Sequence, residues 1–86
     1  MKWQLIVANS ARRVTRDMPH AEGDRIAEAL EEMRADPYVG DIKYLNGSDR
    51  RDLRRRVGAW RVIYEVDAHQ RLIVVHDVRR RASHTY

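Results

Sequence analysis

The second half of the sequence is rich in side chains that bind phosphate. Residues 44–86 contain ten arginines and no lysine, and three of the arginines, Arg54, Arg56 and Arg61, flank a Gly58-Ala59 turn signal. A guanidinium is planar, stays charged at physiological pH and donates to two phosphate oxygens at once. This half has a net charge of +5, whereas residues 1–43 have a net charge of −1. The distribution indicates a surface for a polyanion, with a solvated basic surface as the alternative.

A second group of candidate residues lies in the last eight positions: Arg79, Arg80, Arg81, His84 and Tyr86. A histidine titrates near neutrality and can transfer protons, and a tyrosine can stack on a base or donate a hydrogen bond to phosphate. These residue types are useful for ribonuclease chemistry. A solvated basic tail is the alternative interpretation.

Composition excludes several other kinds of chemistry. The 86 residues are enough for one domain, 1–86, and contain no cysteine, so disulfides, thiolate nucleophiles and cysteine-ligated zinc are ruled out. No Asp, Glu or His spacing resembles a metal site, and we interpret His76 as a packed or rim histidine. No apolar run approaches the length of a membrane span. We therefore expect a cytoplasmic protein without metal or other cofactor that is not bound to a membrane.

Hydrophobic periodicity predicts the elements of the first half. Residues 3–8 alternate at period two, as in a strand that is apolar on both faces. Ser10 is the predicted N-cap of a short helix, and a second helix over residues 20–36 ends at Asp36-Pro37. The apolar stripe of the second helix is narrow, so we expect this αα-hairpin to pack on one face of a sheet; the stripe is Ile26, Ala29, Leu30 and Met33.

After Pro37 the hydrophobic period changes to two. Residues 42–45 begin a candidate strand that breaks at the turn signal of residues 46–49. Residues 52–57, 60–66 and 71–78 are predicted as three strands joined by tight turns. We therefore predict an α+β fold of order β-α-α-β-β-β, with two N-terminal helices packed on a mainly antiparallel four-stranded sheet.

A two-residue loop at Gly58-Ala59 fixes which residues share a face of this sheet. It pairs Arg56 with Arg61, and directly opposed residues point to the same side. One side then holds Arg54, Arg56 and Arg61. The other is the predicted floor for the helices, with Arg55 as the exception among its apolar residues Leu53, Val57, Trp60, Val62, Tyr64 and Val66.

The predicted pairing of Arg56 with Arg61 requires a counter-ion, because like charges placed opposite each other repel. Glu65 and Asp52 fall on the same face and are one possible source. A bound phosphate is the other, and the site would then be prepared for the negative charge of a transition state.

Residues 53–66, LRRRVGAWRVIYEV, resemble the RelE/ParE toxin superfamily, whose members have a pattern like R-x-R-V-G-x-[YW]-R-V-[IL]-Y. Asp36-Pro37 with Leu45-Asn46-Gly47 resembles the D-P…L-x-G segment of this superfamily. Val78-Arg79-Arg80-Arg81 with Tyr86 resembles its final V-x-x-R…Y. The matches span most of the chain in the same order. The fold that the resemblance implies, two helices on a mainly antiparallel sheet, agrees with the periodicity.

The resemblance implies the toxin of a type II toxin-antitoxin pair, with a cognate antitoxin as its partner. The RelE-like branch of the superfamily cuts mRNA in the ribosomal A site, whereas the ParE-like branch inhibits DNA gyrase and is not a nuclease. The arginines together with His84 and Tyr86 favour an endonuclease that cuts mRNA and depends on the ribosome. Gyrase inhibition is the alternative, and a non-toxic interaction module is a third.

The resemblance also implies roles for single residues. Arg54 lies where RelE-like toxins have a lysine assigned to proton transfer. Arg56 and Arg61 match phosphate-binding arginines, and Arg81 matches a phosphate ligand or acid. Tyr86 matches a tyrosine that stacks on or orients the substrate. Arginine keeps its proton near neutral pH, which makes His84 the alternative general base to Arg54. The predicted catalytic residues are Arg54, Arg61, Arg81, His84 and Tyr86, and the predicted RNA-binding residues are Arg54, Arg56, Arg61, Arg79, Arg80 and Arg81.

Overall fold

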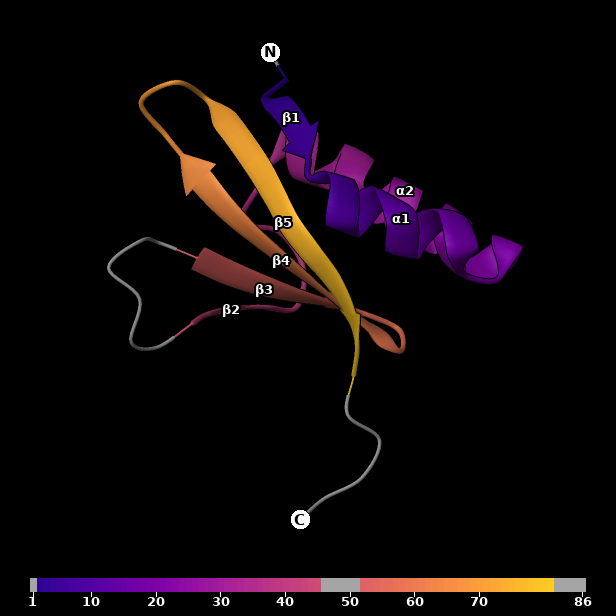
Figure 1. Ribbon diagram of the computed structural model, residues 1–86. Coiled ribbons are helices and arrows are strands. Elements are labelled where there is room, and N and C mark those ends of the chain that lie inside the picture. The colour runs from indigo at the N-terminus through magenta and orange to yellow at the C-terminus, as the bar shows by residue number, and fades with distance from the viewer. Residues whose placement is uncertain (1, 46–51, 82–86) are drawn as a thin grey trace.

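In a computed structural model, which describes residues 2–45 and 52–81, two helices cover one face of a five-stranded sheet (Figure 1). The strand order across the sheet is β1-β5-β4-β3-β2. Along the chain the elements are β1 (Gln4–Val7), α1 (Asn9–Asp17), α2 (His20–Ala35), β2 (Ile42–Tyr44), β3 (Asp52–Val57), β4 (Trp60–Asp67) and β5 (Leu72–Arg80).

The α+β class with an αα-hairpin on a mainly antiparallel sheet is confirmed, but the prediction of four strands is wrong. The short segment Ile42–Tyr44 is a fifth strand, which pairs with β3. The helices follow β1, and β1 pairs with β5 in the parallel direction. The chain between these two parallel strands includes both helices and β2, β3 and β4, so it is far longer than the crossover that parallel pairing needs.

The boundaries of α2 match the prediction, whereas those of α1 do not. The helix α2 ends at Ala35, before Asp36-Pro37, and buries Ile26, Ala29 and Met33. The helix α1 starts two residues earlier than predicted, and its N-cap Ala8 has no side-chain cap. Ser10 instead donates from Oγ to the backbone oxygen of His76 on β5, at 3.2 Å. No helix in the described part of the chain is long and apolar enough to cross a membrane.

The core lies between the helices and the inner face of the sheet. The residues there that have no exposed surface include Met33, Leu53, Val62, Tyr64, Ile73 and Val75. Trp3 and Trp60 are half-buried and pack against this cluster. The hydroxyl of Tyr64 donates to the backbone oxygen of Pro37 at 2.8 Å. This hydrogen bond ties the sheet to the segment that follows α2.

Tyr64 makes stability depend on pH in the alkaline range. Burial raises the pKa of its hydroxyl from 10.0 to about 12. Its contribution is complete below pH 10, where the unfolded tyrosine is also neutral, and is lost as pH rises from 10 toward 12. Tyr64→Phe leaves the Pro37 oxygen unpaired, which we expect to cost about 1–2 kcal/mol near pH 7 and to flatten the alkaline loss. Urea titrations at several pH values measure both effects. The exposed Tyr38→Phe is the control, and an equally flat profile for that variant would contradict the prediction.

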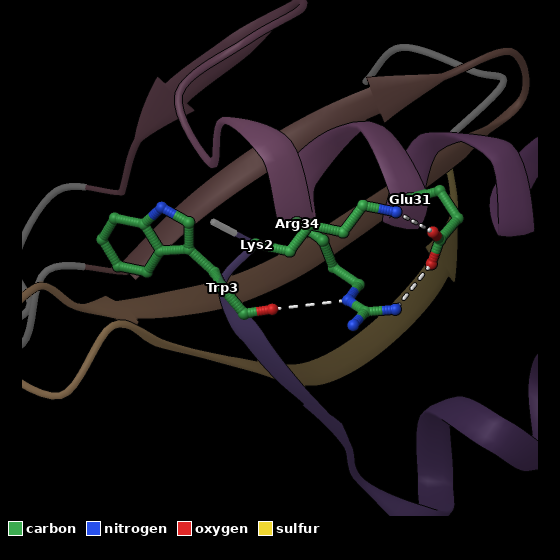
Figure 2. A network of polar contacts seen from close by, with 4 residues as sticks. All are labelled: Lys2, Trp3, Glu31 and Arg34. Atoms are coloured by element: carbon green, nitrogen blue, oxygen red, sulfur yellow. Dashed lines mark hydrogen bonds and ion pairs between the residues drawn. The ribbon is translucent and has the colours of Figure 1, made fainter.

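A small polar network fixes the start of β1 against α2 (Figure 2). Nε of Arg34 donates to the backbone oxygen of Trp3 at 3.3 Å, and Nη1 donates to Glu31 at 3.1 Å. Lys2 donates to the other Glu31 oxygen at 3.4 Å. These hydrogen bonds, that of Arg34 first, lower the pKa of Glu31 below its ordinary value. The pairs are exposed and contribute little to stability, so their effect is to position the chain.

A bulge interrupts β5 where it pairs with β4. The register shifts between Ile63 and Tyr64, which leaves His76 of β5 without a partner. Val75 and Val78 are both buried although they are three residues apart, a spacing that regular alternation does not allow. The extra residue therefore keeps the inner face apolar on both sides of the bulge.

Candidate nucleic-acid interface

Three arginines from neighbouring strands lie in one row on the outer face of the sheet, away from the helices. The strands β3 and β4 pair Arg56 with Arg61, which confirms the predicted register. The strands β4 and β5 pair Arg61 with Arg79. Directly opposed residues have Cβ atoms about 5 Å apart. We call Arg56, Arg61 and Arg79 the arginine row.

The two outer members of the row have carboxylate neighbours, and the central one does not. Nε of Arg56 lies 3.9 Å from Oδ2 of Asp41, and Nε of Arg79 donates to Oδ2 of Asp77 at 2.7 Å. Within residues 2–45 and 52–81, the guanidinium of Arg61 has no carboxylate partner. Its Nε is buried without a hydrogen bond. Arg61, at the centre of the row, is thus a half-buried cation that can bind an anion.

Glu65 and Asp52 do not balance the charge of the arginine row. They lie opposite each other, four residues along their strands from Arg61 and Arg56. Four residues of strand span about 13 Å, well beyond an ion pair. Oε1 of Glu65 lies 3.0 Å from Nε2 of His76. The prediction that Glu65 and Asp52 supply the counter-ion is therefore wrong, and the carboxylates next to the row are those of Asp41 and Asp77.

Lys43 is a candidate site residue that the sequence analysis missed. It is exposed on β2 and directly opposite Arg54 of β3, so both side chains project from the outer face. Nε of Arg54 is buried without a hydrogen bond. An ammonium group exchanges its proton more readily than a guanidinium does. Lys43 therefore places an ammonium group, which can exchange its proton, next to the guanidinium of Arg54. The alternation of residues 42–44 was the signal for this placement, but it is only three residues long.

Two further arginines lie on the helix side of the sheet. Arg55 is only 9% exposed, and it donates to the backbone oxygen of Ala29 at 3.2 Å and to Glu32 at 2.5 Å. Arg80, predicted as an RNA-binding residue, pairs in register with Trp60 and lies 5.4 Å from the centroid of its ring. The structure therefore brings Arg79 to the row and places Arg80 on the opposite face.

The remaining predicted residues lie at the end of β5. The backbone N–H of Arg81 donates to the oxygen of Ala59 at 2.7 Å, which holds Arg81 beside the turn between β3 and β4. Nε of Arg81 is buried without a hydrogen bond. His84 and Tyr86 lie outside the described residues, and their roles stay predictions.

Two helices on one face of a five-stranded, mainly antiparallel sheet make this a RelE-like α+β fold. The chain is similar to RelE in the archaeal RelE-RelB complex from Pyrococcus horikoshii OT3, with a TM-score of 0.85, 22% identity and coverage of 98% of this chain and 100% of that one. The isolated E. coli RelE toxin gives a TM-score of 0.79 at 17% identity, covering 95% and 87%. The YoeB/ParE toxin from Agrobacterium tumefaciens gives 0.77 at 16%, covering 92% and 99%. At such identities the similarity shows the fold.

Family membership comes from the sequence. Residues 7–84 match the family model of the ParE toxin of type II toxin-antitoxin systems, parDE. The chain therefore belongs to this toxin family, within the RelE/ParE superfamily that residues 53–66 indicated. A comparison with curated protein sequences found no match.

Proposed function

We propose that this toxin is a ribosome-dependent mRNA endonuclease whose arginine row binds the scissile phosphate. The observation that supports this most directly is the position of Arg61, a half-buried cation between two other arginines and without a carboxylate partner among the described residues. A nuclease needs such a group because the phosphorane formed during cleavage carries more negative charge than the phosphate diester.

The proposed reaction is attack of a ribose 2′-OH on the adjacent phosphate. A base takes the proton of the 2′-OH, the new O–P bond forms, and the bond to the 5′-oxygen breaks as an acid protonates that oxygen. Arg61 and Arg56 stabilise the phosphorane, and Arg79 and Arg81 bind the flanking phosphates. From the sequence alone, His84 is the proposed base and Tyr86 the group that stacks on the RNA.

Gyrase inhibition without nuclease activity is the second candidate function. The matching family model is that of ParE toxins, and Arg54 replaces the lysine that RelE-like toxins use for proton transfer. Under this alternative the basic face would bind gyrase or be covered by a partner.

Primer extension on cellular mRNA after induced expression separates the two candidates. We expect translation to stop and new 5′ ends to appear at codon positions only in translated messages. Supercoiling by purified gyrase should remain unchanged when the toxin is added. Uncut mRNA together with a loss of supercoiling would overturn the nuclease proposal.

The proposed partner is a cognate antitoxin that neutralises the toxin by covering the basic face. Solved relatives in complexes include RelE with RelB from Pyrococcus horikoshii and RelBE2 from Mycobacterium tuberculosis. Arg61 at the centre of the row has no carboxylate partner among the described residues, so an acidic antitoxin segment would be stabilised there. Action on translating ribosomes places the toxin in the cytoplasm.

Lys43 should contribute to cleavage although it does not lie in the arginine row. Its ammonium group next to Arg54 adds positive charge and an exchangeable proton on the outer face. We expect Lys43→Ala to reduce mRNA cleavage by about 10- to 100-fold, as measured by single-turnover cleavage on programmed ribosomes. Lys2→Ala is the matched control, because Lys2 is the other lysine and pairs with Glu31 of α2. Equal cleavage rates for the two variants would show that Lys43 does not contribute to cleavage.

A further inference from the structure

Three metal-ligating side chains come together on the outer face, beyond the arginine row. Asp52 of β3, Glu65 of β4 and His76 of β5 each offer one ligand atom, and these atoms lie within 4.8 Å of one another. Nε2 of His76 is already 3.0 Å from Oε1 of Glu65. All three residues are half-buried. The cluster spans three adjacent strands and is separate from Arg61.

The carboxylate of Asp52 has no partner in the described part of the chain. It lies directly opposite Glu65, and two carboxylates in that arrangement repel. Oδ1 of Asp52 is buried and accepts no hydrogen bond. Arg54, two residues away on the same strand face, forms no ion pair with it. A buried acceptor beside a second carboxylate is favourable only when a cation or a proton donor is present.

The bulge in β5 brings the imidazole to these carboxylates. Regular alternation from the buried Val78 would point His76 toward the core. The shift of register between Ile63 and Tyr64 instead allows His76 to reach Glu65 on the outer face. Bulges commonly redirect a side chain in this way.

We propose that Asp52, Glu65 and His76 bind a divalent transition-metal cation of the Zn²⁺ type. One imidazole and two carboxylates suit Zn²⁺, whereas Mg²⁺ and Ca²⁺ prefer oxygen ligands alone. Bonds of about 2.0–2.1 Å in a tetrahedron place ligand atoms about 3.3 Å apart, so side-chain shifts of about 1 Å complete the site, with water as fourth ligand. The metal would link β3, β4 and β5. This site does not depend on the proposed nuclease activity.

Thermal unfolding of the full-length chain with added Zn²⁺ tests the site. For a dissociation constant of about 10 µM, roughly 100 µM Zn²⁺ should raise Tm by roughly 5–10 °C at pH 7.5. The rise should disappear in His76→Ala and should fall to about a third or less in Asp52→Asn. Isothermal titration with Zn²⁺ should give one site per chain.

His69→Ala is the matched control, because His69 is exposed in the turn between β4 and β5. His84→Ala checks a histidine outside the described residues. Both variants should keep the full Zn²⁺ effect. An unchanged wild-type Tm with no heat of binding would overturn the proposal, and so would an equal rise in His76→Ala. If His76→Ala does not fold, the proposal is tested by titrating Asp52→Asn with Zn²⁺, which should bind at least about tenfold more weakly than wild type.

Discussion

Arg61→Ala is expected to make the protein non-toxic and to lower mRNA cleavage on programmed ribosomes by about 100- to 1,000-fold. In the proposed reaction the central guanidinium of the arginine row stabilises the developing negative charge, and losing one such donor from a preorganised site costs about this much. Arg61 also lies between Arg56 and Arg79, so its removal relieves repulsion in the free protein. The variant should therefore fold at least as well as the wild type while being inactive.

Arg13→Ala is the matched control for this variant. It removes the same charge from an exposed position on α1, on the helix side of the sheet. Arg61→Lys should recover only part of the activity, because an ammonium cannot donate to two phosphate oxygens in one plane. A fully toxic Arg61→Ala protein that still inhibits gyrase would instead support the second candidate function. Lost toxicity with an unfolded protein would contradict the expected stability.

Gly40→Ala is expected to have the largest effect on stability. Gly40 has φ of +92°, a conformation that residues with a side chain rarely adopt. A Cβ there would lie 2.7 Å from Nε and 2.9 Å from Cζ of Arg55. Arg55 cannot move away without losing its hydrogen bonds to Ala29 and Glu32, which would leave a buried charge unpaired. We expect a loss of about 2–4 kcal/mol, or roughly 10–25 °C in Tm.

Gly23→Ala provides a control of opposite sign. A Cβ at this position in α2 would meet Thr15 and Met18 at ordinary contact distances of 3.6 and 3.7 Å. Removing a glycine from a helix interior should stabilise the protein by about 0.5–1 kcal/mol. Urea denaturation of both variants measures the two changes. A loss below about 0.5 kcal/mol for Gly40→Ala would mean that Arg55 rearranges freely.

Local patterns predicted the β3–β4 hairpin because a two-residue loop fixes every pair in it. Placing Arg56 opposite Arg61 needed only the Gly58-Ala59 turn and alternation. The strand β2 was only a candidate and was left out of the predicted sheet, because three residues give little periodicity; its omission also hid Lys43.

Other features depend on contacts between distant segments, which no local pattern encodes. Adjacency suggested that Arg79 and Arg80 act together, yet alternation in β5 sends them to opposite faces. Asp52, Glu65 and His76 lack the short spacing of metal motifs because each comes from a different strand. The bulge in β5 brings His76 to the two carboxylates. Its only sign in the sequence is that Val75 and Val78, which are both buried, are three residues apart.

The parallel pairing of β1 with β5 has a consequence for synthesis of the toxin. The backbone N–H of Gln4 bonds to the oxygen of Arg71, and Gln4 to Val7 pair with Leu72 to Val75. The strand β1, which leaves the ribosome first, therefore cannot join the sheet until β5, the last strand, has formed. Such distant pairing slows folding. Newly made chains therefore cannot complete the sheet until β5 has been synthesised.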